Sequence, residues 1–512
     1  MPANIKISPV LCAACGAICS YYCLFPLFRA GLINIDALLV LAFVPVSALC
    51  LFRVLAAWPP SYLWCAGNTK PQTVRLVRLL PLYAAAFSAG LALGISAGAN
   101  VVSPVYFGIS ENAIVGVSGV LLDDPRLVSG GRAISTLSLK MAMGQGDVRV
   151  TARGEITVFF IEENAERLRE FGRGAEVFVE GNLKEGTGGF DGAYVMSAET
   201  LHVAKAAPPV ERFRTGLRLG LTQRFLPVEG ANWGGMSLAL LLGIRDNLDT
   251  GIAAQYRNCG CSHILALSGM HLAVLVGIVS FLLKKPFGLR PAAIAGACII
   301  IAYCFIVGPL PSLNRAALMY LLGVFAALGM LKRDALLLLC MAFLIQMVFT
   351  PQAGFSLSFI LSYLALAGIL IIGETINDFF RGKVPSIVLK PVSASLGAFI
   401  ATAGAAAWFF GALRPVGIIA ALVLTPLTTV FMAGSLLWLG VDIIAPSFSF
   451  VLGKPLSLLY LSMEKIAAAA SHIPGIKANP WLVLLLSLLT IAGLFWLEHR
   501  RRMFANRLEP FP

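Results

Sequence analysis

RNCGCSHILALSGMHLAVLVGIVSFLL, residues 257–283, is a long apolar run whose first 15 residues contain His263, Ser268 and His271. A helix needs about 20 predominantly apolar residues to cross a bilayer, and this stretch supplies them. Ionisable and polar side chains are expensive at membrane depth and usually mark a pathway or a site. The stretch therefore predicts a membrane helix that begins with a polar feature.

The composition of the whole chain points the same way. Of 512 residues, 58% are hydrophobic and only 13% are charged, whereas a soluble domain carries about 25% charged residues. Apolar stretches recur often enough to predict a polytopic α-helical membrane protein with about 12 spans. We expect these spans near 9–28, 33–52, 75–98, 263–283, 287–308, 314–331, 334–350, 353–373, 390–410, 414–432, 434–452 and 480–497. Three other stretches, 213–225, 233–248 and 453–479, are too charged or too short and are predicted to be interfacial or re-entrant.

Residues 100–212 interrupt the membrane pattern. Apolar and polar residues alternate there, and Gly and Asp mark the turns. Three strands, a helix and two strands form the order of an OB-fold barrel. The sequence therefore predicts an inserted extracytoplasmic OB-fold-like β-barrel domain, which serves as a docking element or binds single-stranded nucleic acid. The expected strands are 114–122, 133–141, 148–161, 175–183 and 194–203, and the expected helix is 162–171.

The net charge of +13 is unevenly distributed. Residues 101–212 contain 15 acidic and 11 basic residues, and the rest of the chain contains 11 acidic and 28 basic residues. When the predicted spans alternate, the basic clusters fall on one side, as the positive-inside rule requires. This pattern predicts a multi-pass protein of the plasma (inner) membrane with both termini in the cytoplasm, although the same charge would also help a polyanion to pass. The predicted parts are N-terminal membrane helices (1–99), the extracytoplasmic domain (100–212), a membrane domain (213–499) and a basic cytoplasmic tail (500–512).

The polar residues of the opening stretch do not suit catalysis or metal binding. His263 and His271 are eight residues apart, which is about 12 Å along a helix, too far to share one zinc ion. Ser268 and His271 are one turn apart, but no acid lies nearby to orient the histidine. We therefore expect no catalytic residue, metal site or cofactor. These side chains either pack helices together or line a hydrophilic pathway.

Two further polar groups are candidates for the same pathway. The segment GPLPSLNRA, residues 308–316, breaks a helix and places Asn314 and Arg315 at the start of the next apolar run. Arg315 suits a phosphate contact, or it pairs with a carbonyl or a lipid headgroup at the interface. Ser356 and Ser358, in the segment GFSLSF, line a cavity or pack helices.

The order of these motifs resembles the ComEC competence family, which contains the DNA channel of natural transformation. The matching segments are GCSH (260–263) with LALSGMH (265–271), PSLNRA (311–316), FSLSF (355–359) and the Gly/Pro-containing stretch 408–427. In the third segment Ser356 stands where the family usually has Gln. Many relatives continue into a metallo-β-lactamase-like domain with a His-x-His-x-Asp-His motif. None of the five histidines here has that spacing, so the resemblance is to the form without this domain, and no nuclease or other enzyme activity is expected.

The resemblance implies a membrane channel for uptake of single-stranded DNA into the cytoplasm. The implied partners are single-stranded DNA, the lipid bilayer, and separate components that act as DNA receptor, nuclease and energy source. No Walker A motif is present, so the energy must come from elsewhere. Two alternatives remain open: a transporter of another substrate on a ComEC-like scaffold, and a structural subunit that needs a partner.

Overall fold

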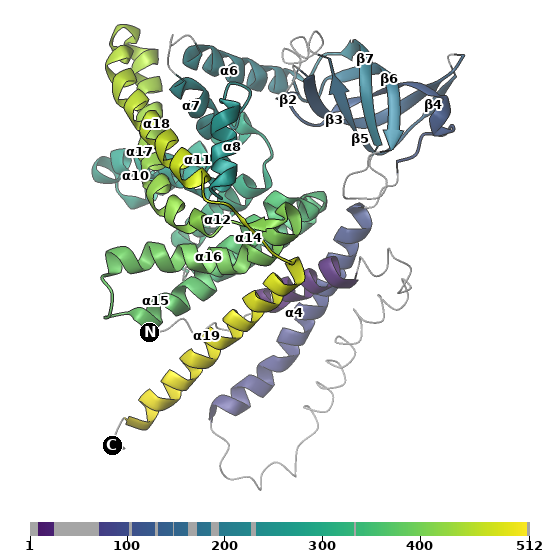
Figure 1. The fold of residues 1–512 in the computed structure, drawn as a ribbon. Helices are drawn as coiled ribbons and strands as arrows, with labels where there is room; N and C mark the ends of the chain where they lie inside the picture. The colour runs from purple at the N-terminus through teal and green to yellow at the C-terminus, as the bar shows by residue number, and fades with distance from the viewer. Residues whose placement is uncertain are drawn as a thin grey trace.

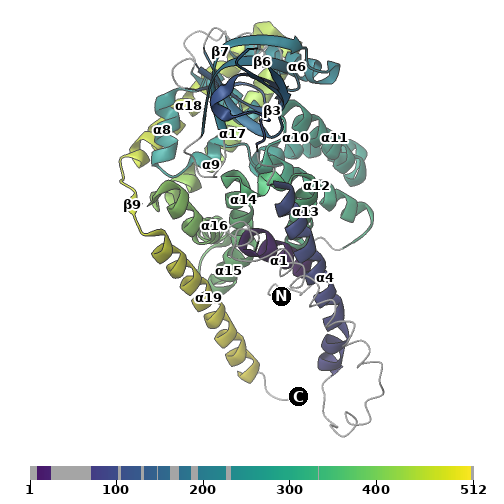
Figure 2. The same ribbon diagram turned by 90° about the vertical axis from the view of Figure 1, so that its right-hand side faces the viewer.

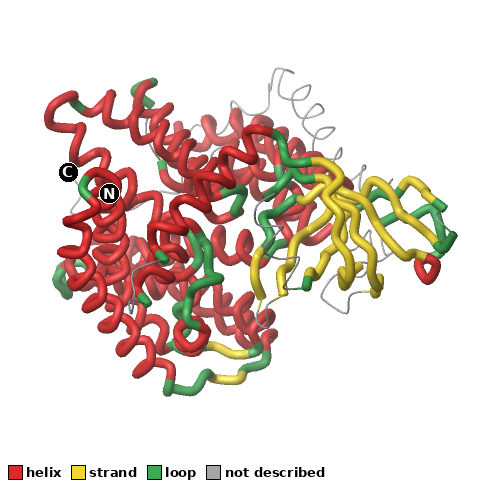
Figure 3. Tube along the Cα trace, turned by 90° about the horizontal axis from the view of Figure 1, so that it is seen from above, coloured by secondary structure: helices red, strands yellow, loops and turns green. Residues whose placement is uncertain are grey.

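The computed structural model describes residues 9–24, 71–101, 105–128, 132–146, 148–161, 172–185, 194–226, 232–331 and 334–508. Within these residues the chain forms a bundle of helices and a β-sheet that lies at one end of the bundle (Figure 1). Helix α4 (Pro71–Val101) leads toward the sheet, and α6 (Pro209–Phe225) returns from it to the bundle. Seen from above, the sheet lies to one side of the helices (Figure 3).

Seven strands form this sheet, in the order β1-β6-β7-β5-β3-β2 with β4 beside β3, and β1 also pairs with β3. Strands β5 and β7 are parallel, and the other pairs are antiparallel. Burial alternates along β5, so that every second side chain enters one shared core. The strands are β1 (Ile114–Leu121), β2 (Arg126–Val128), β3 (Arg132–Gly144), β4 (Arg149–Thr151), β5 (Glu155–Phe160), β6 (Glu176–Glu185) and β7 (Tyr194–Lys205).

The predicted strands agree with this sheet except in two places. The expected strand 148–161 is divided into β4 and β5, because Gly154 between them has φ +113°, a value that ends an extended strand. Strand β2 was not predicted, since three residues are too few to show an alternating pattern. The predicted helix 162–171 lies outside the described residues.

The helices of the bundle include six that are long and apolar enough to cross a membrane: α10, α11, α12, α16, α17 and the continuous segment Leu357–Phe380. Shorter apolar helices occupy other predicted spans, and 33–52 lies outside the described residues. The count of about 12 spans therefore stays a prediction. The remaining bounds are α1 (Pro9–Ile18), α7 (Trp233–Leu242), α8 (Thr250–Asn258), α9 (Ser262–Leu265), α10 (Gly269–Phe287), α11 (Leu289–Val307), α12 (Pro311–Leu328), α13 (Ala335–Phe349), α14 (Leu357–Gly368), α15 (Glu374–Phe380), α16 (Ser386–Phe410), α17 (Val416–Ile444), α18 (Ser449–Ser471) and α19 (Pro480–Leu508).

Two of the predicted spans, 414–432 and 434–452, are wrong in their bounds. Helix α17 is continuous through Pro426 and the intervening glycines, and it ends only at Ile444. The break comes at Ala445, because the residue before a proline, here Pro446, disfavours the helical conformation. The stretch 453–479, predicted to be interfacial, consequently forms most of helix α18.

The core of the bundle contains α7, whose ten residues are all buried. Its side chains share one apolar cluster with α8, α17 and α18, including Trp233 and Trp438, whose rings meet edge to face at 5.2 Å. Helices α4 and α19 extend away from the sheet on opposite sides of the bundle (Figure 2). A small second sheet of β8 (Ala412–Leu413) and β9 (Ile476–Lys477) joins the loops that precede α17 and α19.

Candidate functional site

Two helix breaks lie against each other inside the bundle. The first, residues 266–268, separates α9 from α10, and the second, residues 308–310, separates α11 from α12. The Ser312 hydroxyl donates a 2.6 Å hydrogen bond to the Leu267 carbonyl and so joins the two breaks. Gly308 has φ +96°, which favours glycine, and Pro309 and Pro311 lack the N–H that a continuous helix would use. The predicted continuous span 263–283 is therefore wrong at its beginning.

Ser268 and His271 form the cap of α10. The Ser268 N–H donates to His271 Nδ1 at 3.1 Å, and the Ser268 hydroxyl lies 3.2 Å from the same nitrogen. Because Nδ1 accepts from the backbone, the ring proton is on Nε2. Nε2 is buried and has no hydrogen-bond partner in the described part of the chain. The pair thus satisfies a helix terminus, as a capping box does, and its geometry is not that of a nucleophile and base oriented by an acid.

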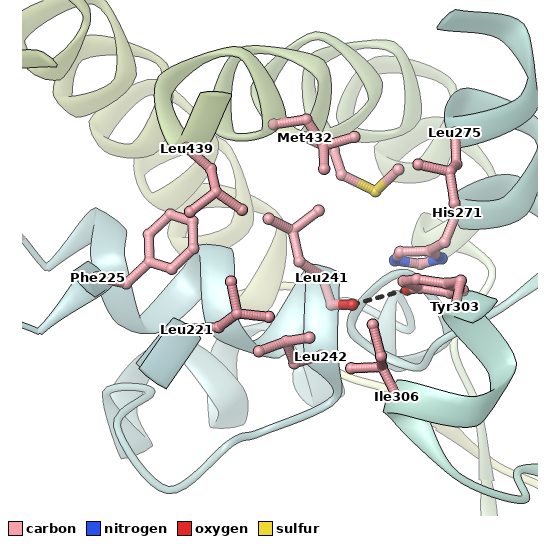
Figure 4. A pocket seen from close by; sticks show the side chains of 11 residues that line it. Leu221, Phe225, Leu241, Leu242, His271, Leu275, Tyr303, Ile306, Met432 and Leu439 are labelled. Atoms are coloured by element: carbon pink, nitrogen blue, oxygen red, sulfur yellow. Dashed lines mark hydrogen bonds between the residues drawn. The ribbon is translucent and has the colours of Figure 1, made fainter. Parts of the chain in front are cut away.

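His271 also borders an apolar cavity of about 110 Å³. Figure 4 shows its ring beside Tyr303 at one side of the cavity, with leucine, methionine and phenylalanine side chains around the rest. The Tyr303 hydroxyl donates to the Leu241 carbonyl at 2.7 Å and is thereby satisfied. Apart from His271 and Tyr303 the lining is apolar, so the cavity presents few hydrogen-bond donors to an anion.

Arg315 lies among α10, α12 and α14 and is 8% exposed. Its Nη1 donates to the Ser362 carbonyl, and its guanidinium carbon is 5.7 Å from the centre of the Tyr363 ring. A Cβ built on Gly269 would lie 4.0 Å from Arg315 Nη2, so the guanidinium sits against the first turn of α10. Among the described residues no carboxylate forms a salt bridge with Arg315, and its Nε has no hydrogen-bond partner.

A chain of hydrogen bonds surrounds this arginine. The Tyr363 hydroxyl donates to Gln346 Oε1 at 2.7 Å, and Gln346 Nε2 donates to the Pro311 carbonyl at 3.3 Å. The second break is therefore tied to α13 and α14 around Arg315. Tyr363 and Gln346 were not selected from the sequence, because neither stands in a polar pattern that distinguishes it from a packing residue.

The structure brings together only part of the predicted set. Ser268 and His271 on α10 and Arg315 on α12 adjoin the paired breaks, and Asn314 is half-buried beside Arg315. The other three candidates are placed differently. His263 and Ser358 are exposed. Ser356 caps α14 by accepting from the Phe359 N–H at 3.3 Å, which is a local structural role.

Two arginines outside the predicted set hold the breaks in place. Arg218 on α6 donates through Nη1 to the Ile306 and Val307 carbonyls, at 3.0 and 2.9 Å, where α11 ends. Arg245, in the loop after α7, donates to the Leu265 carbonyl at 3.0 Å, where α9 ends. Arg218 belongs to a stretch predicted to be interfacial on its amphipathic pattern. The sequence signal for Arg245 is its place just after Gly243, where an apolar helix ends.

The sheet is fastened to α6 by a buried ion pair. Arg214 donates to both oxygens of Asp124, at 2.9 and 2.5 Å, and its Nε donates to Glu211 at 2.7 Å. Burial raises the pKa of Asp124, but the Arg214 hydrogen bond and the charges of Arg218 and Arg214 lower it by more, so the pKa lies below its ordinary value. Asp124 follows β1, so this contact sets where the sheet meets the bundle.

Comparison with known proteins places the paired breaks inside a recognised region. The sequence matches the family described as Competence protein over residues 240–500, which is half of the chain. The chain belongs to the Competence protein family. The match includes both helix breaks, and it also includes Arg245 and Arg315. It does not include the sheet, Arg214 or Arg218.

Two curated relatives match part of this Competence family chain. One is the ComE operon protein 3 of Bacillus subtilis (strain 168), 27% identical over 187 residues, or 35% of this chain and 23% of the relative. The other is an uncharacterized protein of Aquifex aeolicus (strain VF5), 30% identical over 194 residues, or 38% of this chain and 44% of the relative. This chain therefore spans less than half the length of the curated relatives that it matches. No solved structure matches it.

Proposed function

We propose that the helix bundle forms the route by which a single strand of DNA enters the cytoplasm during natural transformation, and that Arg315 contacts its phosphates. The observation that carries this proposal is that the guanidinium of Arg315 is buried and forms no salt bridge with any carboxylate of the described residues. Taking a charge out of water costs several kcal/mol unless it is paired. One carbonyl and one aromatic ring compensate it only in part, and a phosphodiester would complete its coordination in the planar geometry that arginine favours.

The surroundings suit transient contacts. Irregular backbone at membrane depth is tolerated only where it is buried in protein or lines a water-filled cavity. The two helix breaks lie inside the bundle and meet this requirement. Conduction needs contacts that are favourable but weak enough to release the ion or strand. A single arginine between two breaks meets that condition better than a dense cationic cluster would.

Deletion and complementation test this function. A strain that lacks the chain should fail to bring labelled DNA into its cytoplasm, and the wild-type gene should restore uptake. Arg315→Ala should restore less than about a tenth of it at equal membrane protein level, with Arg315→Lys intermediate because the charge remains but the planar fork is lost. Arg212→Ala is the matched control, since Arg212 is exposed. Normal uptake by the Arg315→Ala strain would refute the channel role of this residue, and normal uptake by the deletion strain would refute the function.

The orientation is part of the proposal: plasma (inner) membrane, both termini cytoplasmic, and the sheet outside as an OB-fold-like barrel. The pairing of β1 with both β6 and β3 supports the barrel. The exposed residue Gln145 lies in the turn after β3, and the exposed residue Lys285 lies in the last turn of α10, at the end predicted to be cytoplasmic. An impermeant thiol reagent should label Gln145→Cys in spheroplasts, above the signal of the native cysteines, and Lys285→Cys only after lysis. The reverse pattern would invert the topology.

We further propose that the chain itself does not cut DNA and works with a separate receptor, nuclease and energy source. The Ser268–His271 pair caps α10 with no acid to orient the histidine, which supports the first part of this proposal. Purified protein incubated with DNA and Mg²⁺, Mn²⁺ or Zn²⁺ should leave the DNA intact. Cleavage that disappears on His271→Ala substitution would contradict the proposal.

A further inference from the structure

We infer that Arg126, Arg218 and Arg245 form a second phosphodiester-binding site, at the junction of the sheet and the bundle, which a nucleic-acid strand meets before it reaches Arg315. This inference rests on the proposed function and adds a site outside the set derived from the sequence. Arg126 comes from the edge strand β2, Arg218 from α6 and Arg245 from the loop after α7. Three separate parts of the chain thus contribute to one junction.

The geometry joins this site to the paired breaks. Arg218 bonds the carbonyls at the end of α11, where the second break begins. Arg245 bonds the Leu265 carbonyl, where the first break begins. Ser312 closes the connection between the breaks, and Arg315 follows it by three residues on α12. The junction arginines are therefore linked through the paired breaks to the helix that carries Arg315.

The charges at the junction are incompletely balanced. Asp124 is shared, since it accepts both hydrogen bonds from Arg214 and also lies 3.7 Å from Arg218 Nε. In the described part of the chain, neither Arg126 nor Arg245 forms an ion pair with a carboxylate. A bound anion would relieve this concentration of positive charge through charge-assisted hydrogen bonds.

Arg126 is close enough to both Arg245 and Arg218 for its charge to act on each of them. Burial is the main cause that lowers the pKa of Arg245, and the charge of Arg126 lowers it further. Burial also lowers the pKa of Arg218; Asp124 and Asp246 oppose this, and Arg214 and Arg126 add to it. Arginine stays charged at any physiological pH, so all three positive charges are available to an anion.

A nucleic-acid strand fits the arrangement better than a lipid headgroup. Arg126 is exposed and belongs to the sheet, and all three arginines lie outside the six candidate spans. A lipid headgroup would neutralise one point at the bilayer edge. The junction instead presents a succession of cations that runs from the sheet to the breaks, and a polymer with regularly repeated phosphates can contact them in turn.

The test uses the purified full chain in nanodiscs of zwitterionic phosphatidylcholine and a fluorescent oligothymidylate of about 20 nucleotides, long enough to reach past one phosphate-binding groove. Arg126→Gln and Arg245→Gln should each weaken binding several-fold. Each should also flatten the dependence of log affinity on log salt by about 0.7, the contribution of one phosphate contact in a single strand. Arg245→Lys should keep most of the affinity, which separates loss of charge from loss of fold. Arg212→Gln, on the same helix as Arg218 but exposed, is the control and should change nothing.

The outcomes separate this inference from the function on which it rests. Unchanged oligonucleotide affinity and salt dependence in Arg126→Gln and Arg245→Gln would overturn the junction site, even if Arg315→Ala abolishes uptake. Loss of phosphatidylglycerol binding in these variants, with oligonucleotide binding intact, would likewise overturn it and assign the arginines to lipid. If the deletion strain takes up DNA normally, the function itself fails, whatever the variants bind.

Discussion

The junction and the centre of the bundle each bury an arginine, and they treat its charge in opposite ways. Arg214, at the junction, is 2% exposed and donates to Asp124 and Glu211. Arg315, in the bundle, is 8% exposed, and among the described residues its charge meets a carbonyl and an aromatic ring but no carboxylate. Both arginines are buried, and the difference in their charge partners separates an arginine that stabilises the structure from one that is available to a ligand.

This difference has an energetic meaning. Removing one partner of a buried ion pair leaves an uncompensated charge behind, which is strongly destabilising, whereas removing an uncompensated charge is not. The two arginines should therefore respond to substitution with different signs. The predictions that follow run from the largest expected loss of stability to an expected absence of loss.

Arg214→Ala should produce the largest loss. It leaves Asp124 and Glu211 facing each other without their shared cation, and breaking a buried pair costs about 3–5 kcal/mol. Thermal unfolding of the purified protein in detergent measures this loss, with Arg212→Ala as the control at an exposed site of the same helix. Equal transition temperatures for the two variants would show that the ion pair does not hold the junction.

Acid should weaken the same junction by less. The folded pKa of Asp124 lies below its ordinary value of 3.8, so the stabilisation is fully present above about that pH and is lost as pH falls through the folded pKa. The loss is smaller than in Arg214→Ala, because a protonated carboxyl still accepts a hydrogen bond from Arg214. When thermal unfolding is measured between pH 6 and pH 2.5, the transition temperature should fall less steeply with falling pH in Asp124→Asn than in the wild type; this fall is the acid limb. If the acid limbs of the two proteins are equally steep, protonation of Asp124 does not contribute to the loss of stability in acid.

Ser312→Ala should cost about 1 kcal/mol, the usual net value of one hydrogen bond. The substitution removes the 2.6 Å bond to Leu267 that joins the two breaks and leaves a buried carbonyl unsatisfied. Because the bond lies between the breaks and not at the junction, the acid limb should stay as in the wild type. Asn314→Ala, at the half-buried neighbouring position, is the control. An unchanged transition temperature in Ser312→Ala would mean that the breaks are held together by packing alone.

The general architecture could be predicted from the sequence, since hydrophobic run length and strand alternation are local signals. Four of the five expected strands were found where alternation and turn residues placed them. The predicted division into two spans at 432–434 was wrong. Glycines inside an apolar helix are tolerated, and the helix ends only before Pro446. The break at 266–268 was also missed, since every residue in Ala266-Leu267-Ser268 is compatible with a helix.

The site was predicted less completely, for a different physical reason. Arg315 stood out, because it follows a Gly- and Pro-rich break at the start of an apolar run. Arg218 and Arg245 did not, since their partners are carbonyls some 88 and 20 residues away in sequence, and a backbone acceptor leaves no signature in the residue type. His263 and Ser358 are exposed in the structure, and their place on a pathway stays a prediction.

The sharpest contrast comes from the same substitution at both arginines. Arg214→Met keeps much of the side-chain volume and should still lose several kcal/mol, because two carboxylates remain without their cation. Arg315→Met should lose nothing, or gain up to about 1 kcal/mol, because a methionine needs no counter-charge in an apolar surrounding. For DNA uptake at equal protein level, the order of the two variants should be reversed. A strain with Arg315→Met should take up little DNA, and a strain in which Arg214→Met protein accumulates should keep most of its uptake. A destabilised Arg315→Met protein would show that the Ser362 carbonyl and the Tyr363 ring compensate the charge fully. Arg315 would then be a structural residue like Arg214, and no unmet charge would remain in the bundle for a passing phosphate.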